Sequence, residues 1–179
     1  KTSPKVTVKY STVNPTNQNV IVTITADKEI QEVEGWTLDS SKKILTKEYT
    51  ENAEEEITVK DLIGNTTKAS VKVANIDKIK PTVTVNKSIT AQTNQDVTVT
   101  ITANEEIKAV SGWTLGSDKK TLTKIYNENK SETVTVTDLA GNTTTAQIEV
   151  GNINKTSPKV TVKYSTVNPT NQNVIVTIT

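Results

Sequence analysis

The chain has 179 residues, and its 21 basic and 20 acidic side chains nearly balance and are interspersed, which argues against nucleic acid or an anionic membrane surface as a partner. Cysteine, histidine, methionine and phenylalanine are absent, so disulfides, thiol nucleophiles, Cys/His zinc sites and imidazole acid–base catalysis are excluded. No apolar run is long enough to span a membrane and no signal peptide is visible, so we expect any export signal to lie outside this sequence.

The sequence repeats with a period of 77 residues: Trp36 recurs as Trp113, and the opening string KTSPKVTVKYSTVNPTNQNVIVTIT recurs letter for letter at the end. A fixed offset of this kind indicates a repeat array. The predicted domains are an A-type repeat at 1–77, a B-type repeat at 78–154, and at 155–179 the truncated start of a third repeat that is identical to 1–25. We therefore expect the chain to be a window of a longer array in which the two types alternate.

β-Branched residues dominate and alternate with polar residues in short segments bounded by turn residues. Such alternation is typical of strands with one buried face, and no segment has the apolar spacing of a helix. In chain order, strands of the first repeat are predicted near residues 4–11, 19–26, 31–38, 43–50, 55–61 and 66–75, with equivalents in the second repeat. This pattern predicts an all-β fold of tandem immunoglobulin-like antiparallel sandwiches with little or no helix.

Comparison of the two repeats indicates which side chains face the core, because a buried position must stay apolar in both copies. Val20, Val22 and Ile24 stay apolar in the second repeat, whereas Ile21 becomes a threonine. The predicted core of the first repeat is Val6, Val8, Val20, Val22, Ile24, Val33, Trp36, Leu38, Leu45, Tyr49, Ile57, Val59, Leu62, Val71 and Val73, and the second core is the equivalent set one period later.

The single tryptophan of each repeat is predicted to fill the centre of the sandwich. Trp36 follows Gly35 in the predicted third strand with Leu38 on the same face, and Trp113 and Leu115 are the equivalents. In a sandwich without a disulfide or phenylalanine, one large ring has much of the core to fill. The alternative is an exposed indole that stacks on a sugar ring.

A turn motif separates the last two predicted strands of each repeat. It consists of Asp61, Gly64 and Asn65 in the first repeat and of Asp138, Gly141 and Asn142 in the second. Glycine supplies the positive φ that a three-residue hairpin loop requires, and the aspartate can accept hydrogen bonds from the backbone of the turn. The alternative makes Asp61 and Asn65 calcium ligands, although this turn offers few of the about six oxygens that calcium takes. No other cofactor is predicted.

Carboxylates are concentrated at residues 51–56, but the second repeat keeps fewer of them, which favours a solvated connection over a pair of hydrolytic acids. A covalent cross-link between a lysine and an asparagine, catalysed by a carboxylate, is a further alternative. Residues of the required types that recur one period later are Lys42, Lys43, Lys47, Asn52, Asn65, Asn75, Glu29, Glu51 and Glu55.

Pro4, Pro81 and Pro158 lie near the start of successive repeats, where their fixed φ and the extended residue before them predict stiff linkers. A strand of about seven residues spans about 23 Å, so each repeat is expected to advance the array by about 35 to 40 Å. Residues 155–179 hold two predicted strands and no tryptophan, and a two-stranded ribbon cannot bury its apolar face alone. We expect this segment to be disordered, to pair with another chain, or to complete its core with residues outside this sequence.

The motifs of the second repeat carry a family resemblance. They read Gly-Trp-Thr-Leu from Gly112, then Lys-Lys, Leu-Thr-Lys and a tyrosine, and finally Val-Thr-Val-Thr-Asp-Leu-Ala-Gly-Asn-Thr-Thr from Val134. Over essentially its whole length the chain resembles the bacterial immunoglobulin-like repeats of exported surface proteins of Gram-positive bacteria, especially clostridia. The resemblance implies an extracellular or cell-surface location and no catalytic residues, since such repeats mostly serve as stalks and spacers.

Three functional hypotheses follow. The first is a non-catalytic structural array that acts as a stalk, spacer or fibre segment of a surface protein or adhesin, with neighbouring repeats as its partners. The second is an adhesive module whose loops at one end, such as 39–43 and 50–56, bind a host glycan or protein. The third is a fibre subunit that exchanges strands with other copies through the incomplete third repeat.

Overall fold

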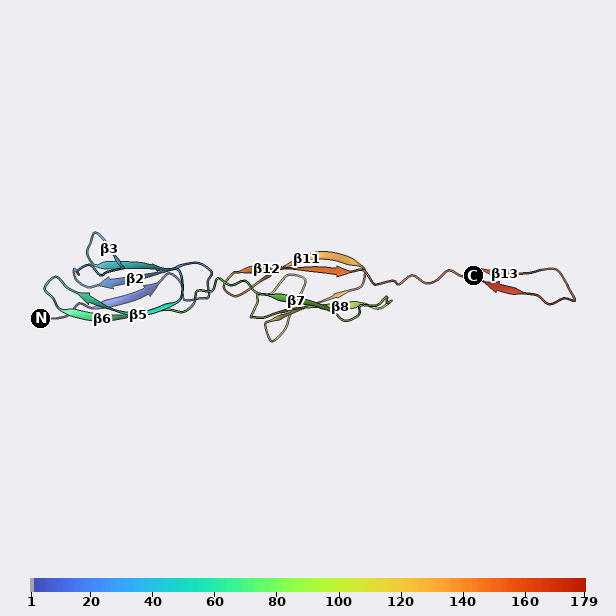
Figure 1. Cartoon of the computed structure of the whole chain (residues 1–179), viewed down its shortest axis with the longest axis horizontal. Coiled ribbons are helices and arrows are strands. Elements are labelled where there is room, and N and C mark those ends of the chain that lie inside the picture. Colours follow the sequence, from blue (N-terminus) through green and yellow to red (C-terminus); the bar gives the residue numbers. More distant parts are fainter. Residues whose placement is uncertain (1) are drawn as a thin grey trace.

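The computed structural model describes residues 2–179, and this part of the chain contains β-strands and no helix. Figure 1 shows two sandwiches and a hairpin that follow one another along the long axis, with the N-terminus at the opposite end from the hairpin. The prediction of an all-β fold with tandem antiparallel sandwiches is confirmed. Nothing within residues 2–179 forms a helix of the length and apolarity that crossing a membrane requires.

The first sandwich packs a four-stranded sheet against a two-stranded one. Its strands are β1 (Val6–Tyr10), β2 (Val20–Ala26), β3 (Thr37–Leu38), β4 (Ile44–Tyr49), β5 (Ala53–Lys60) and β6 (Thr66–Val73). The first sheet has the order β1-β2-β4-β3, and β5 and β6 form the second, with antiparallel pairing throughout. An isolated antiparallel bridge joins Ile30 to Asp61, next to β5. This matches the ABED and CFG sheets of an immunoglobulin sandwich, with strand C reduced to one bridge.

The second sandwich repeats this arrangement. Its strands are β7 (Val83–Lys87), β8 (Val97–Ala103), β9 (Thr114–Leu115), β10 (Thr121–Tyr126), β11 (Lys130–Thr137) and β12 (Thr143–Val150). The sheet order is β7-β8-β10-β9, and β11 pairs with β12. Ile107 bridges to Asp138 as Ile30 does to Asp61. The two repeats therefore place equivalent residues in equivalent environments, and differences between them can be compared directly.

The predicted third strand at 31–38 is wrong over most of its length. Only its last two residues form a strand, β3, and Trp36 lies just before it in a turn closed by a 3.0 Å hydrogen bond from its amide to the carbonyl of Val33. Gly35 has a φ of 76°, and Gly112 has the same value. This left-handed conformation breaks the extended path that the apolar spacing of the segment indicated.

Each sandwich has its own hydrophobic core, formed by the inward faces of its two sheets. The fully buried members of the first include Ile24, Ile30 and Leu45, each at most 1% exposed. Leu62, predicted to be buried, is 54% exposed, because it lies in the turn beyond the last β5–β6 pair, where no facing sheet covers it. Core residues that the prediction omitted are Ala26, Ile30, Ala69 and Ile76.

Residues 155–179 form a hairpin of β13 (Val162–Tyr164) and β14 (Val176–Ile178). Its register pairs Lys163 with Thr177, just as β1 and β2 pair the identical residues Lys9 and Thr23. All residues of the two strands are exposed, whereas the equivalent residues of β2 are mostly buried. The apolar face of the hairpin is thus formed but not covered by any other described residue.

Replacing Gly64 with alanine is expected to destabilise the first repeat by about 1 kcal/mol, the cost of a left-handed conformation in a residue with a Cβ. Gly64 has a φ of 94°, and an added Cβ would meet nothing within 4 Å, so the cost is purely conformational. Urea denaturation measures it. Gly151→Ala is the control, because Gly151 has equal space without a positive φ; equal losses for both variants would contradict the assignment.

Candidate functional site

Each sandwich contains a cluster of one lysine, one glutamate and two aromatic rings. In the first repeat, Nζ of Lys47 on β4 lies 2.8 Å from Oε1 of Glu55 on β5. The same Nζ lies 5.8 Å from the ring centroid of Trp36 and 5.0 Å from that of Tyr49. The Tyr49 hydroxyl also donates a short hydrogen bond to Glu55. The ammonium group is thus held by an anion and by two aromatic rings together.

The second repeat rebuilds this cluster with Lys124, Glu132, Tyr126 and Trp113. Its ion pair is 2.6 Å long, and the two rings meet edge to face with centroids 6.4 Å apart, as they do in the first repeat. Trp36 is 9% exposed, and Trp113 is only partly buried. Because aliphatic side chains occupy the fully buried positions, the indoles lie toward the margin of each core and close it beside the ion pair.

The electrostatics of the cluster favour a stable ion pair. Hydrogen bonds from Lys124 and then Tyr126 hold the pKa of Glu132 below its ordinary value of 4.5. Burial works to raise the pKa of Glu55, but hydrogen bonds from Lys47 and Tyr49 outweigh it and the pKa is again lowered. Burial, followed by the neighbouring glutamate, raises the pKa of each tyrosine, so both phenols stay protonated. Neither carboxylate has the raised pKa of a general acid, and the cluster is suited to holding β4 against β5.

Replacing Glu132 with glutamine is expected to destabilise the second repeat by about 1 kcal/mol at neutral pH, the contribution of charge-assisted hydrogen bonds at a site that is partly open to solvent. Because the folded-state pKa is depressed, this contribution is present above the unfolded-state pKa and is lost as the pH falls through the folded-state pKa. Denaturation at several pH values should show the two proteins converging in acid. Glu128→Gln, at an exposed position, should match the parent chain at every pH.

A shallow hollow lies beside each tryptophan, and it tests the sugar-platform alternative. In the first repeat it measures about 430 Å³ and is lined by Ile21, Gly35, Thr37, Thr46, Lys47 and Glu48. Trp36 does not line this hollow, but it lines a second one of about 580 Å³ together with its neighbours in residues 32–38. Even there the side chain is only 9% exposed, and its buried Nε1 finds no hydrogen-bond acceptor among the described residues. A stacking platform requires an open ring face, and Trp36 presents little of one. Leu38 and Leu115 are partly buried against their cores.

The turn at residues 61–65 is built around a buried carboxylate. Asp61 is 2% exposed, and its Oδ1 accepts hydrogen bonds from the amides of Ile63 at 3.1 Å and Asn65 at 2.8 Å. Its Oδ2 accepts a 2.8 Å hydrogen bond from Nδ2 of Asn65. The side-chain bond from Asn65 is the largest cause of the lowered pKa of Asp61. Asp61 and Asn65 thus use their polar groups to hydrogen-bond each other and the turn backbone, which is the arrangement of a structural turn.

The equivalent turn of the second repeat forms the joint between the two sandwiches. Asp138 holds it in the same way, through Gly141, which has a φ of 101°, and Asn142. Nδ2 of Asn142 also donates to the carbonyl of Asp77 in the first repeat at 2.9 Å. The amide of Asn17 donates to the carbonyl of Ala140 at 3.0 Å. The joint therefore connects the end loops of one sandwich to a turn of the next.

Three carboxylates meet at this joint. Oxygens of Asp77, Glu105 and Asp138 lie within 4.8 Å of one another, and Asp138 is 1% exposed. Burial raises the pKa of Glu105 first, and the charges of Asp138 and Asp77 raise it further. A calcium ion takes about six oxygens, and this group supplies one each from three side chains, so it falls well short of a calcium cage. Its evident property is mutual repulsion across the joint.

The linkers are fastened to the sandwiches that they leave. Backbone hydrogen bonds join Thr16 to the strand end at Asn75 and Asp77, and Nζ of Lys78 donates to Oδ1 of Asn19 at 2.8 Å. In the second repeat Lys155 forms a 2.6 Å ion pair with Asp96 at the equivalent place. Pro4 and Pro81 are buried, whereas Pro158 is exposed. The linker after each sandwich is therefore fixed by side chains as well as by its own backbone.

The grouping of lysine, asparagine and carboxylate that comes closest to what a lysine–asparagine cross-link requires lies at this linker. Asn19 accepts from Lys78 and donates to Glu48 at 3.0 Å, which places an amide between an amine and a carboxylate. Lys78 and Glu48 are exposed, whereas the cross-link calls for a lysine and a carboxylate that are shielded from water. The predicted residues are used otherwise: Lys47 pairs with Glu55, and Asn52 exchanges hydrogen bonds with the backbone of Ile76.

The loops that the adhesive hypothesis placed at one end of the domain lie at opposite ends. Residues 39–43 precede β4, and residues 50–52 follow it, so the length of a strand separates them. The acidic segment is mostly strand, because β5 begins at Ala53, and its Glu54 and Glu56 form exposed ion pairs with Lys72 and Lys68 on β6. Residues 39–43 and 50–56 therefore do not form one binding surface, and Glu54 and Glu56 are paired with lysines instead of forming a pair of catalytic acids.

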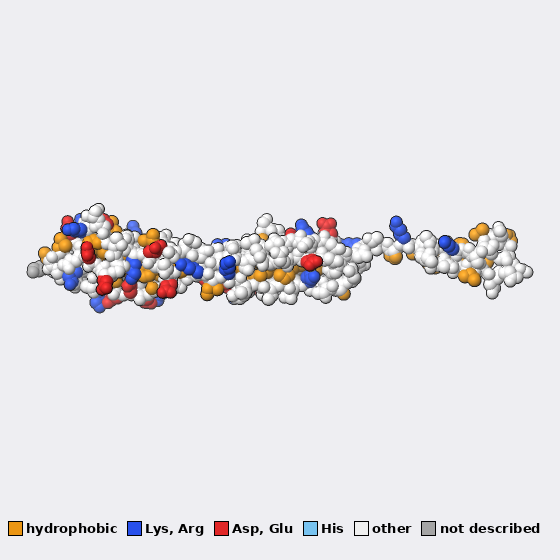
Figure 2. Space-filling view, turned by 45° about the horizontal axis from the view of Figure 1, so that its top comes forward, with side chains coloured by type: hydrophobic (Ala, Val, Ile, Leu, Met, Phe, Trp, Pro, Cys, Tyr) orange, Lys and Arg blue, Asp and Glu red, His pale blue; other side chains and the backbone are white. Residues whose placement is uncertain are grey.

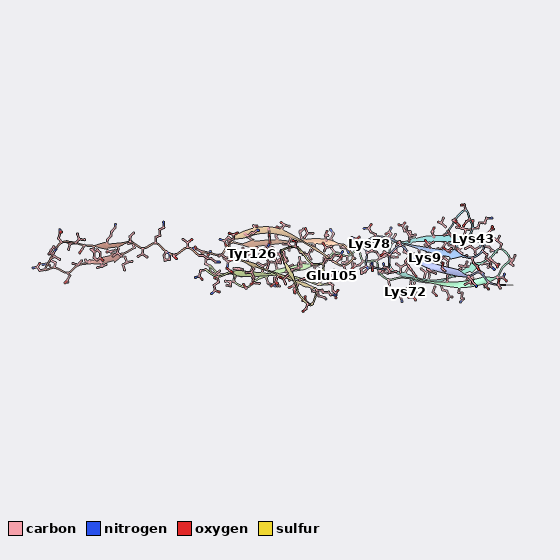
Figure 3. All side chains as sticks on the ribbon, turned by 180° about the vertical axis from the view of Figure 1, so that it is seen from behind. Lys9, Lys43, Lys72, Lys78, Glu105 and Tyr126 are labelled. Atoms are coloured by element: carbon pink, nitrogen blue, oxygen red, sulfur yellow. The ribbon has the colours of Figure 1, made fainter. Side chains whose placement is uncertain are left out.

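The sequence interpretation missed Glu105, Asp77, Asn19 and Lys78 as residues of the joint and linker. One signal was available, since the residue equivalent to Glu105 in the first repeat is Lys28, a charge reversal between otherwise similar copies. Figure 3 labels Glu105 and Lys78 near the meeting of the two sandwiches, with Tyr126 well inside the second. Comparisons with protein-family models, curated proteins and solved structures found no match to this chain.

Proposed function

We propose that the chain is a non-catalytic spacer, a segment of a stalk or fibre on a bacterial surface protein. The observation that carries this proposal is the head-to-tail joint, in which Asn142 and Ala140 of one sandwich bond to Asp77 and Asn17 of the preceding one. Because each linker leaves its sandwich at the end opposite to entry, repeats add length rather than bulk (Figure 1). The bacterial surface location is part of the proposal and rests on the family resemblance.

The surface also supports a spacer. Acidic and basic side chains are interspersed over both sandwiches (Figure 2), and exposed cross-strand ion pairs such as Glu54–Lys72 line the outer strands. Such a surface keeps a long molecule soluble without attracting a partner of one charge. Each repeat closes its own core, so length can be changed by whole repeats without loss of the rest.

Small-angle scattering and sedimentation test the spacer role. Chains that contain this sequence with one, two and three added 77-residue units should stay monomeric, and their maximum dimension should rise by a constant increment of about 35 to 40 Å per unit. A dimension that rises less steeply with each added unit would mean that the array folds back, and the spacer role would fail.

A second candidate function, strand exchange between copies, is favoured by the uncovered hairpin β13–β14. Its residues 155–179 are identical to 1–25, and its Val176 and Ile178 correspond to Val22 and Ile24, which are fully buried. The hairpin therefore has the shape and sequence to take the place of β1 and β2 in another copy. Concentration-dependent assembly that disappears when residues 155–179 are deleted would support it, and a monomer at high concentration would exclude it.

A further inference from the structure

One position carries opposite charges in the two repeats: it is Lys28 in the first and Glu105 in the second. It lies at the end of the sandwich that faces the preceding repeat. In the first repeat, Nζ of Lys28 lies 3.9 Å from Oδ2 of the buried Asp61 and donates a 2.8 Å hydrogen bond to the carbonyl of Thr2. Lys28 thus faces the turn carboxylate and also holds the segment that leads into the sandwich. In the second repeat the equivalent residue is Glu105, which faces the equivalent carboxylate, Asp138.

The charges around Glu105 come from both sandwiches. Asp138 belongs to its own sandwich and Asp77 to the preceding one, and both act against its ionised form. On the other side, Lys120 favours the ionised form weakly, while its Nζ is 3.3 Å from the carbonyl of Asn104. Lys119 instead forms an ion pair with Glu106, whose Oε2 lies 3.7 Å from the Lys119 Nζ. An excess of negative charge therefore spans the joint.

The attraction across the joint is of the same order as this repulsion. The end loops are joined by the hydrogen bonds from Asn17 to Ala140 and from Asn142 to Asp77. Beside them a cleft of about 240 Å³ separates Pro15 from Leu139, so the apolar surfaces of the two sandwiches are not sealed together. Neutral, partly buried hydrogen bonds such as these contribute on the same scale as repulsion between close carboxylates. The balance can therefore be shifted by one charge.

We propose that this joint is electrostatically loosened, and that the residue at position 105 sets how widely the two sandwiches swing relative to each other. With glutamate at this position, swinging apart separates Glu105 and Asp138 from Asp77 and relieves their repulsion. With lysine, as in the first repeat, the joint would be held closed by attraction to both aspartates. The far end of the second repeat carries Asn154 in place of Asp77, so the acidic arrangement belongs to this joint.

The joint should respond to acid. The raised pKa of Glu105 in the closed arrangement means that its protonated form favours closure, so the swing should narrow as the pH falls toward the carboxylate range. Above that range Glu105 is ionised and the joint is loose. This behaviour is a property of the joint itself and holds whether or not the array serves as a spacer.

Pulsed electron–electron resonance between two spin labels measures the swing. The chain has no cysteine, so Lys9→Cys and Asn86→Cys place labels at equivalent exposed positions of β1 and β7, one in each sandwich. At about pH 7.5 with a chelator present, the parent chain should give a broad distance distribution that narrows by about a third or more at about pH 5. Glu105→Lys and Glu105→Gln should give the narrow distribution at both pH values.

Glu106→Gln is the matched control, because Glu106 is the adjacent carboxylate and faces Lys119 instead of the acidic group. It should keep the broad distribution at neutral pH and the response to acid. The proposal is overturned if Glu105→Lys is as broad as the parent chain, or if Glu105→Gln still narrows in acid. If the maximum dimension in small-angle scattering departs from the expected increment while the spin-label distances behave as described, the spacer role fails and the proposal for the joint stands.

Discussion

Replacing Leu45 with alanine is expected to unfold the first repeat at a much lower urea concentration while the second repeat keeps its own transition. Leu45 is fully buried at the centre of the first core, and truncation of such a leucine costs about 3 kcal/mol through lost burial and the cavity that remains. A domain of this size is stable by about 4 to 11 kcal/mol, so a large share of the stability of one repeat is removed. The two cores share no residue, and the change should stay local.

The two tryptophans allow each repeat to be followed separately. A chain with Trp113→Phe reports on the first sandwich through Trp36, and a chain with Trp36→Phe reports on the second through Trp113. Leu45→Ala should shift the first signal and leave the second in place. Leu122→Ala, the equivalent change in the second core, should do the reverse. If either variant shifts both signals equally, the repeats unfold as one unit, and the picture of separate cores fails.

Replacing Asp138 with alanine is expected to cost the second repeat about 3 kcal/mol, which is the other large effect. The carboxylate is buried and accepts hydrogen bonds from the amides of Gly141 at 2.6 Å and Asn142 at 2.8 Å and from Nδ2 of Asn142 at 2.8 Å. Alanine leaves these donors without an acceptor in a place where water has little access. The Trp113 signal in urea measures the loss.

Asp138→Asn serves as the comparison for that change. Asparagine keeps an oxygen that accepts from the two backbone amides, but its Nδ2 would face the Nδ2 of Asn142, and two donors cannot bond each other. About half of the stability lost in Asp138→Ala should therefore also be lost in Asp138→Asn. Asp61→Ala tests the same turn away from the joint and should destabilise the first repeat instead. Equal stability of Asp138→Ala and the parent chain would show that the buried carboxylate does not hold the turn.

Much of the fold could be predicted because strand alternation is a local property. Val20, Val22 and Ile24 alternate with polar or variable residues in both copies, and they form the buried face of β2. The prediction failed where a single residue changes the path of the backbone. The apolar spacing around Val33 and Trp36 resembles a strand, but the left-handed Gly35 turns the chain, and the core position is filled by Ile30 through an isolated bridge.

The candidate site could be predicted only in part, since it depends on contacts between distant segments. Lys47 and Glu55 were visible as recurring residues, but their pairing requires β4 and β5 to lie in facing sheets. The joint depends on how two sandwiches meet, which no pattern within one repeat encodes. The reversal from Lys28 to Glu105 marked the position, and only the nearby Asp77 gives it a meaning.

The direction of the terminal strands has a mechanical consequence. In Figure 1 the strands of both sandwiches lie close to the long axis, and each sandwich is entered at one end and left at the other. A stretching force carried by the linkers therefore pulls β1 along its own length against β2. The five residue pairs between Val6 and Tyr10 and their partners are then loaded in shear, because ladder hydrogen bonds run across the strands. They must yield together, so tension is borne by a whole ladder at once.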